Sequence, residues 1–234
     1  MNPPATLSAS MNAFTRIKIC GLTREADVDA AVDAGADAMG FVLYAQSARA
    51  VGIERAAALA ARLPPFVTPV LLFVNEAPAT VLRALAAVPG AVAQFHGDES
   101  PAQCLEASGH GAHRFLRAAR IPLGAAGAGF DLVKYASDYS HAQAILLDAH
   151  VDGFGGGGKA FDWSLLPTAV DAHLVLSGGL TPANVADGIR QLRPRCRSLA
   201  VDVSSGVEAS KGIKDAGKIR EFVAAVRGAQ VASV

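Results

Sequence analysis

Two residues of this chain, Cys20 and Asp148, have the side chains and the positions that proton-transfer chemistry requires. Cys20 lies at the exit of a short apolar strand, predicted over 16–20, immediately before a predicted helix. A cysteine of a hydrophobic core usually lies within an element, whereas a cysteine at a strand exit can face a pocket. Asp148 closes another apolar run, 145–147. A thiol and a carboxyl group at two strand ends can pass protons to and from one small molecule.

Two loops late in the chain have the composition of a phosphate site. Ser177-Gly178-Gly179 follows one predicted strand, and Ser204-Ser205-Gly206 follows the next. Glycine lets backbone N–H groups approach a phosphate closely, and a helix N-terminus adds a favourable dipole. The first loop alone can equally be a tight turn before a helix capped by Thr181. The prediction of a phosphate site therefore rests on both loops together.

Other polar residues at strand ends are candidates for substrate contacts. His96 and Asp202 close two predicted strands, and Arg49 lies in the loop after the second strand. His96 can equally make a purely structural hydrogen bond, and Arg49 can be a solvated loop residue. The six histidines show no HxH or HExxH spacing, so no metal site is predicted. Cys104 and Cys196 lie in or beside predicted helices, where we expect inert side chains.

These residues need elements that bring them together, and apolar runs that alternate with Ala-rich stretches predict such elements. Short, continuously apolar runs are typical of strands that are buried on both faces. Eight strand–helix units predict an α/β fold, a single closed (β/α)₈ TIM barrel whose catalytic groups lie at the C-terminal ends of the strands. An open doubly wound sheet is the alternative. The predicted strands are 16–20, 38–43, 69–74, 91–95, 114–118, 144–148, 173–177 and 199–203, and the predicted helices are 24–34, 53–63, 78–87, 101–108, 129–137, 162–166, 182–191 and 215–227.

Two details belong to this fold prediction. Thr23 and the pair Thr181-Pro182 are read as the starts of two helices, since proline suits the first helical position. The Gly-rich stretch 153–159 matches nucleotide-binding patterns only weakly, and we expect a mobile loop over the barrel mouth. Its Lys159 can contact substrate or simply be solvated.

The composition limits the compartment and the partners. Lys plus Arg and Asp plus Glu both total 21, and this balance argues against nucleic acid or an anionic membrane as a partner. Three cysteines without paired spacing favour a reducing, cytoplasmic location. We expect a disordered lead over 1–15, in which Met11 can be the true start, a barrel domain over 16–228 and a flexible tail over 229–234.

A series of motifs resembles the phosphoribosylanthranilate isomerase family. The motifs run in the same order over about residues 16–226, which is nearly the whole predicted domain. The matching segments are KICGLT (18–23), AGADAMGFV (34–42), the Ser47-Ala48-Arg49 loop, LLFVNE (71–76), QFHGDE (94–99), LLDA (146–149), GGGGKAFDW (155–163), LSGGL (176–180) and VDVSSGVE (201–208).

The resemblance implies an enzyme of tryptophan biosynthesis. Such an enzyme converts N-(5-phosphoribosyl)anthranilate to 1-(2-carboxyphenylamino)-1-deoxyribulose 5-phosphate by an Amadori rearrangement that uses no cofactor. The family pattern implies that Cys20 is the general base, that Asp148 is the general acid, and that Arg49 helps to hold the anthranilate carboxylate. The residues implied to bind phosphate are Gly178, Gly179, Ser204 and Ser205. The expected partner is this small phosphorylated aminosugar, and the expected assembly is a monomer or a homodimer.

The chemistry also sets expectations for protonation. Cys20 must be available as the thiolate, which an electropositive phosphate site or a helix N-terminus would favour. Asp148 must begin the reaction protonated, which partial burial or nearby negative charge would favour. The chain departs from the family at Gln46, where a lysine is common, and at Gly157 and Ala160, where serine or threonine is common.

Other functions remain open at this point. A ribulose-phosphate epimerase would need metal-ligating histidines, and a histidine-pathway aminoaldose isomerase would need an aspartate in place of Cys20. A barrel that only binds a phosphorylated metabolite, or that serves as an interaction module, would have no use for the acid–base pair.

Overall fold

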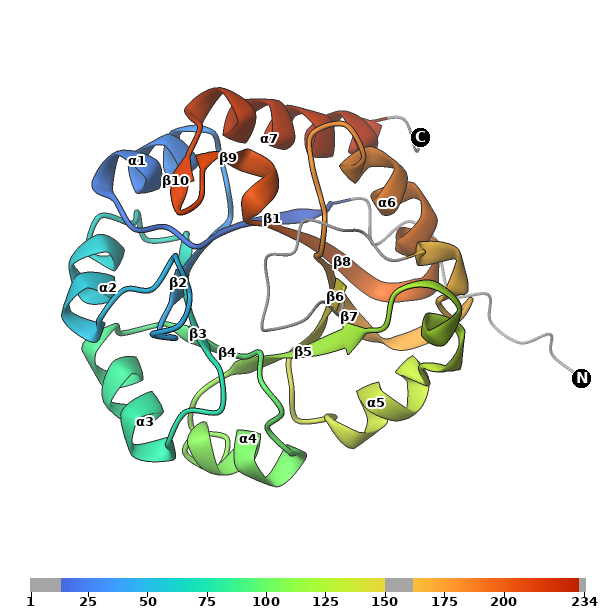
Figure 1. Cartoon of the computed structure of the whole chain (residues 1–234), viewed down its shortest axis with the longest axis horizontal. Coiled ribbons are helices and arrows are strands. Elements are labelled where there is room, and N and C mark those ends of the chain that lie inside the picture. Colours follow the sequence, from blue (N-terminus) through green and yellow to red (C-terminus); the bar gives the residue numbers. More distant parts are fainter. Residues whose placement is uncertain (1–13, 150–161, 232–234) are drawn as a thin grey trace, which may run out of the picture.

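The computed structural model describes residues 14–149 and 162–231, and a closed barrel of parallel strands lies at its centre (Figure 1). The strands neighbour one another in chain order, and parallel pairing of β1 with β8, with Lys18 opposite Asp202, closes the ring. The predicted (β/α)₈ barrel is therefore confirmed, and the open sheet is excluded. The barrel strands are β1 (Arg16–Cys20), β2 (Ala38–Val42), β3 (Thr68–Phe73), β4 (Val92–Phe95), β5 (Phe115–Ile121), β6 (Ala144–Ala149), β7 (Val170–Leu176) and β8 (Cys196–Val203).

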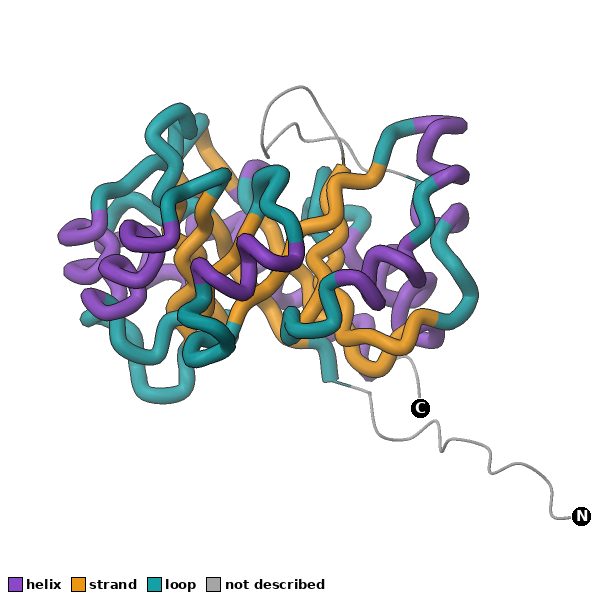
Figure 2. Tube along the Cα trace, turned by 90° about the horizontal axis from the view of Figure 1, so that it is seen from below, coloured by secondary structure: helices purple, strands orange, loops and turns teal. Residues whose placement is uncertain are grey.

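Helices surround the barrel, as the view from the side in Figure 2 shows, with purple helices outside orange strands. Two helices begin with proline at the first position, and α4 also has a capping box between Ser100 and Gln103. The α-helices are α1 (Glu25–Asp33), α2 (Ile53–Ala60), α3 (Pro78–Ala87), α4 (Pro101–Ala107), α5 (Leu132–Asp138), α6 (Val185–Leu192) and α7 (Ala216–Val231). Short 3₁₀ helices are η1 (Gly124–Gly129), η2 (Trp163–Leu165), η3 (Arg193–Arg195) and η4 (Ser205–Val207).

The alternation of side chains along each strand separates a hydrophobic core from a polar interior. Outward side chains such as Ile17 and Ile19 are fully buried between the barrel and the helices. The residues between and after them, Lys18 and Cys20, point the other way, because successive side chains of a strand lie on opposite faces. The sequence of β1 therefore places an ammonium group and a thiol inside the barrel.

Several predicted helix boundaries are wrong, for local reasons. Thr23 does not cap α1, because its hydroxyl donates to the carbonyl of Gly212 (3.0 Å). Helix α6 begins at Val185, after Asn184, because the Asn184 side chain accepts from the backbone N–H of Thr181 (2.8 Å) and holds 181–184 as a turn. The predicted helix 162–166 is only the single turn η2.

The C-terminal part of the chain holds a pair of strands that the sequence did not predict. A short antiparallel hairpin, β9 (Glu208–Ser210) and β10 (Ile213–Lys214), lies between β8 and α7. Helix α7 continues to Val231, so the predicted tail over 229–234 begins inside this helix. Thr15, in the predicted lead, is buried, and its carbonyl accepts from Arg227 (3.0 Å).

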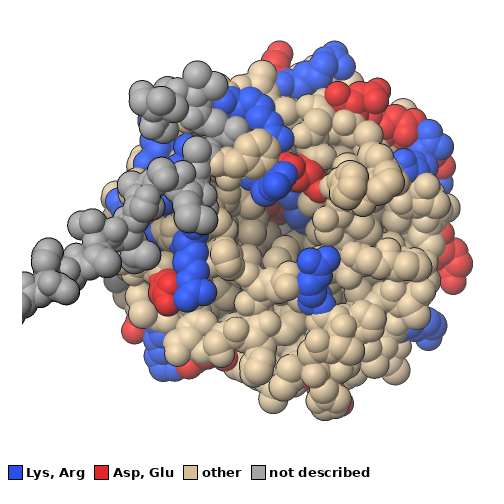
Figure 3. All heavy atoms as spheres, turned by 180° about the vertical axis from the view of Figure 1, so that it is seen from behind, with Lys and Arg blue, Asp and Glu red and all other residues tan. Residues whose placement is uncertain are grey.

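The surface carries charges of both signs. On the face that Figure 3 shows, Lys and Arg side chains (blue) are interspersed with Asp and Glu (red) around the rim. Among the described residues, no helix is both long enough and apolar enough to cross a membrane.

Candidate active site

Cys20 lies where the sequence predicted it, at the C-terminal end of β1, with its side chain inside the barrel. Only 5% of the residue is exposed, and it packs beside Val42, Leu72 and Val74 on the neighbouring strands. Gly40 on β2 makes room for the thiol, because an ideal Cβ at this position would lie 2.7 Å from Sγ of Cys20. The thiol therefore faces an apolar wall and the open end of the barrel.

Lys18 lies two residues before Cys20, on the same inner face of β1, and forms a buried ion pair with Asp202 (2.8 Å). Burial alone would lower the pKa of Lys18, but Asp202 outweighs it and raises the pKa, so Lys18 stays protonated. Burial raises the pKa of the Cys20 thiol, although the ammonium groups of Lys18 and Lys214 act in the opposite direction. The expectation of a favoured thiolate is therefore wrong for the free protein, because desolvation outweighs the positive charges.

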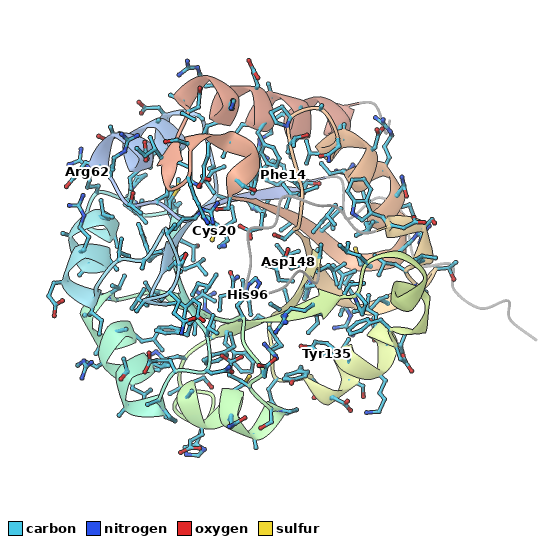
Figure 4. The ribbon with its side chains drawn as sticks, in the orientation of Figure 1. Phe14, Cys20, Arg62, His96, Tyr135 and Asp148 are labelled. Atoms are coloured by element: carbon cyan, nitrogen blue, oxygen red, sulfur yellow. The ribbon has the colours of Figure 1, made fainter. Side chains whose placement is uncertain are left out.

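Asp148 is the penultimate residue of β6 and lies on the inner face of the barrel, and its Oδ2 lies 2.9 Å from Nε2 of His96. Nδ1 of His96 in turn lies 2.9 Å from Nε2 of Gln94, two residues earlier along the chain. All three side chains are buried. Figure 4 shows His96 and Asp148 pointing toward each other, with Cys20 on another side of the same opening. The structure thus brings a carboxyl group and a thiol to one end of the barrel.

The two predicted phosphate loops lie next to each other, between the strands that carry Asp148 and Cys20. They follow β7 and β8, which stand between β6 and β1 in the ring. Gly178 and Gly179 have φ angles of 74° and 66°, which side chains rarely adopt. A Cβ at Gly206 would lie 1.9 Å from the carbonyl oxygen of Leu180, so the two loops are in contact. Ser204 accepts from Lys214 through its carbonyl (3.0 Å) and its hydroxyl (3.2 Å).

Arg49 is held rigidly and is not a solvated loop residue. Its Nε and Nη2 donate to the two carboxylate oxygens of Glu208 (2.6 and 2.8 Å), and Lys214 donates to the same carboxylate (2.9 Å). These hydrogen bonds outweigh burial and hold the pKa of Glu208 below its usual value. The three residues together carry one net positive charge, and the remaining N–H groups of Arg49 can serve another acceptor.

Asp202 and His96 are both engaged by the protein. Ser177 donates its hydroxyl to the second oxygen of Asp202 (3.2 Å), so both oxygens of this carboxylate have partners. Both nitrogens of His96 also have partners, Gln94 and Asp148. The substrate contacts expected of Asp202 and His96 stay predictions.

Two other polar residues at strand ends serve the scaffold. Arg117 points outward from the barrel, donates to Glu99 (3.1 Å) and lies over the ring of Tyr139. Asn75 accepts from the backbone N–H of Asp98 (2.7 Å) and ties neighbouring loops together. The Gly-rich stretch 153–159, with Lys159, lies outside the described residues.

Four residues of the candidate site were missed by reasoning from the sequence. Lys18 and Gln94 each lie on a strand, two positions before a predicted site residue, and this period of two was the available signal. Gly40 and Glu208 lie in the matching segments 34–42 and 201–208, but these segments did not indicate their roles. The role of Gly40 depends on the register of β2 against β1, and that of Glu208 depends on the unpredicted hairpin β9–β10.

Replacing Gly40 with alanine should lower kcat about tenfold or more. The added methyl group would displace Sγ of Cys20 or Cε of Lys18, which would lie 2.7 and 3.1 Å away. A displacement of about 1 Å at a reacting group can cost about 100-fold in rate. Gly52→Ala is the matched control, because its added Cβ would meet only the Glu54 carboxylate at 3.7 Å. Equal kcat values for the two variants would contradict this role of Gly40.

Comparison with known proteins gives one consistent result. Residues 17–225 match the family model of N-(5'-phosphoribosyl)anthranilate isomerase. The chain is 62% identical over 215 residues to the N-(5'-phosphoribosyl)anthranilate isomerase of Methylibium petroleiphilum, with 92% of this chain and 95% of that relative covered.

Solved structures agree with the sequence relatives. The phosphoribosyl anthranilate isomerase of Thermotoga maritima superposes with a TM-score of 0.79 at 39% identity, covering 92% of this chain and all of that one (100%). A second isomerase structure, at 34% identity and a TM-score of 0.72 with 92% and 100% coverage, holds reduced 1-(o-carboxyphenylamino)-1-deoxyribulose 5-phosphate. This chain therefore belongs to the N-(5'-phosphoribosyl)anthranilate isomerase family.

Proposed function

We propose that this chain isomerises N-(5'-phosphoribosyl)anthranilate to 1-(2-carboxyphenylamino)-1-deoxyribulose 5-phosphate in tryptophan biosynthesis, without a cofactor. One observation carries the proposal. Cys20 and Asp148 lie at the C-terminal ends of β1 and β6, inside one end of the barrel, and the glycine loops after β7 and β8 lie between them around the ring. A phosphate bound at these loops would place the sugar between the thiol and the carboxyl group. The bound analogue of the relative's structure has the same phosphorylated aminosugar chemistry.

The proposed reaction uses one acid and one base. Asp148 gives its proton to the furanose ring oxygen, the bond from this oxygen to C1′ breaks, and a Schiff base forms at C1′. Cys20 then removes the proton from C2′ and yields an enolamine. Proton gain at C1′ and loss of the C2′ hydroxyl proton turn the enolamine into the ketone. Exchange with water returns Cys20 and Asp148 to their starting protonation states.

Arg49 is proposed to hold the anthranilate carboxylate. Its bidentate contact with Glu208 fixes the plane of the guanidinium group, and Lys214 balances the charge of Glu208. An ideal Cβ at Gly21 would lie 2.5 Å from Cδ of Arg49, so Gly21, which follows Cys20, lets the arginine approach the end of β1. We propose that this fixed arginine holds the carboxylate without the lysine that the family often has at the position of Gln46.

We propose a cytoplasmic location. The three cysteines are free, including the buried Cys20 and Cys104, which fits a reducing compartment.

Anthranilate fluorescence tests the proposed function. The substrate is made in situ from anthranilate and a phosphoribosyl donor, and its consumption by the purified full chain is followed. Steady loss of the substrate signal with a stoichiometric product supports the proposal, and a chain that leaves the substrate unchanged contradicts it.

The same assay yields a prediction for pH dependence. The active pair, a Cys20 thiolate with a protonated Asp148, carries one proton, as does the pair of a thiol with a carboxylate. The share of the active form is constant while the pair holds one proton. The value of kcat/KM should therefore fall at low pH, where the pair gains a second proton, and at high pH, where the pair loses its last proton as pH rises through the Cys20 pKa. Because burial raises this pKa, the alkaline fall should lie above the ordinary value of about 8.5.

The Cys20→Ser variant is the control for this profile, because serine does not titrate in this range. Its residual activity should lack the alkaline fall. An alkaline fall with its midpoint below about pH 8.5 in the wild type would contradict the prediction, as would an alkaline fall that persists in Cys20→Ser. Either result would assign the titration to another group such as Lys214.

A further inference from the structure

A buried hydrogen-bonded chain runs from Gln94 through His96 to Asp148 inside the barrel. Gln94 is 0% exposed, and His96 and Asp148 are 5% and 6% exposed. The joining distances are 2.9 Å between Nε2 of Gln94 and Nδ1 of His96, and 2.9 Å between Nε2 of His96 and Oδ2 of Asp148. The carboxyl group of Asp148 is therefore connected to a glutamine that is out of reach of a substrate at the barrel mouth.

The amide oxygen of Gln94 is the unusual atom of this hydrogen-bonded chain of side chains. Oε1 is buried and has no hydrogen-bond partner among the described residues. Buried polar atoms without partners are rare in proteins because their desolvation is not compensated. A half-turn of the amide exchanges its oxygen and its nitrogen in nearly the same space. Gln94 can therefore present to His96 either a donor, Nε2, or an acceptor, Oε1.

Each orientation of the amide selects one tautomer of His96, because a neutral imidazole has one donor and one acceptor nitrogen. When Nε2 of Gln94 donates to Nδ1, the His96 proton lies on Nε2 and is donated to an Asp148 carboxylate. When Oε1 of Gln94 accepts from Nδ1–H, Nε2 of His96 is the acceptor. Asp148 can then fill this contact only as the carboxylic acid, with its proton donated to the imidazole.

We propose that Gln94 is a positioning residue for the general acid: its amide sets the His96 tautomer. The Nδ1–H tautomer holds Asp148 as the carboxylic acid before ring opening, and the Nε2–H tautomer holds the carboxylate between turnovers. This inference rests on the proposed function. During the reaction Asp148 gives its proton to the furanose oxygen as the C1′–O bond breaks. The imidazole changes tautomer by proton exchange with water at the barrel mouth between turnovers, so no proton passes through the amide.

The other charged groups around the hydrogen-bonded chain Gln94–His96–Asp148 come from neighbouring strands. Arg120 stands beside Asp148 in the register of β5 and β6, and its Nη1 donates to Asp98 (3.1 Å). Strands β1 and β8 contribute Cys20 and the Lys18–Asp202 ion pair, and Ser177, which follows β7, contributes its hydroxyl. Substitution of Gln94 alters none of these groups, so a changed pH profile in a Gln94 variant reports on the chain through His96.

Two variants of Gln94 and one control test the proposal. Gln94→Met keeps the length of the side chain but removes both the donor and the acceptor, and Gln94→Glu offers His96 an acceptor when ionised. Gln191→Met, at an exposed position of α6, is the control. Gln94→Met should lower kcat about tenfold or more, a part of the contribution of one acid, while KM changes less than about threefold. The control should match the wild type in both constants.

The pH profile separates this role from a purely structural one. The acid-side midpoint of kcat/KM should move to lower pH in Gln94→Met, because the Nδ1–H tautomer of His96, which accepts from the carboxylic acid, loses its own acceptor, Oε1 of Gln94. The same midpoint should move to higher pH in Gln94→Glu, because the introduced carboxylate accepts from Nδ1–H of His96 and so favours the tautomer that holds Asp148 as the carboxylic acid. Unchanged kcat and unchanged midpoints in Gln94→Met would overturn the inference, as would shifts of both variants in one direction.

The outcomes also distinguish this inference from the proposed function. A wild-type chain without isomerase turnover overturns the proposed function, whereas normal wild-type turnover with an unaffected Gln94→Met overturns the inference alone. If Gln94→Met does not fold, ¹⁵N NMR of His96 in the wild-type chain decides. As pH falls through the acid-side midpoint, His96 should stay neutral and change from the Nε2–H to the Nδ1–H form. A doubly protonated imidazole over this range would overturn the inference.

Discussion

Replacing Cys20 with serine should lower kcat at least about 100-fold, the scale of one acid–base contribution. Serine fits the space of the buried thiol beside Gly40, so the packing of β1 against β2 should be retained. Its hydroxyl is a far weaker acid than the thiol and supplies almost no anionic base. KM should change little, because Arg49 and the phosphate loops hold the substrate in our account. Steady-state kinetics with the fluorescent substrate measure both constants.

Cys104→Ser is the matched control for this experiment. Cys104 is a buried cysteine of α4 on the outer side of the barrel, and burial raises its pKa to about 12. The change from thiol to hydroxyl is thus the same, but far from the barrel mouth. Near-normal kcat in Cys20→Ser, or an equal loss in Cys104→Ser, would contradict the assignment of Cys20 as the base.

Replacing Asp148 with asparagine should also lower kcat at least about 100-fold, for a different step. Asparagine keeps the shape of the side chain and can still contact His96, but it has no acidic proton for the furanose oxygen. The variant should therefore bind reduced 1-(o-carboxyphenylamino)-1-deoxyribulose 5-phosphate with nearly normal affinity. Binding is measured by calorimetry, and turnover by fluorescence.

The control for Asp148→Asn is Asp171→Asn, at an exposed position near the start of β7. Its loss breaks a surface ion pair with Arg197, which contributes little to stability, and should leave turnover unchanged. If Asp148→Asn loses analogue binding together with turnover, Asp148 is a structural residue and the acid assignment is wrong.

The fold could be predicted closely because its signal is local. Most barrel strands are largely buried on both faces and contain an apolar run, and the strand predicted over 16–20 matches β1. Local signals fail where a tertiary contact competes. Thr181-Pro182 looks like a helix start, but Asn184 bonds back to Thr181 and to the carbonyl of Gly179 (3.0 Å), so these residues form part of the loop after β7.

The same distinction between local signals and tertiary contacts applies to the candidate site. Cys20 and Asp148 could be predicted because the C-terminal end of a barrel strand always faces the same opening. The ion pair between Arg49 and Glu208 could not be predicted, since it joins residues 159 positions apart through a hairpin without an apolar pattern. The raised pKa of Cys20 was also out of reach, because it depends on the balance between its burial and Lys18.

The primary isotope effect of deuterium at C2′ of the substrate tests the central claim most directly. Cys20 removes this proton in our account, whereas Asp148 acts earlier, at the ring oxygen. Cys20→Ser should therefore show a kcat effect larger than that of the wild type, because proton removal becomes the slowest step. Asp148→Asn should show almost no effect, because ring opening becomes the slowest step. The opposite pattern, with the larger effect in Asp148→Asn, would contradict the assignment of base and acid.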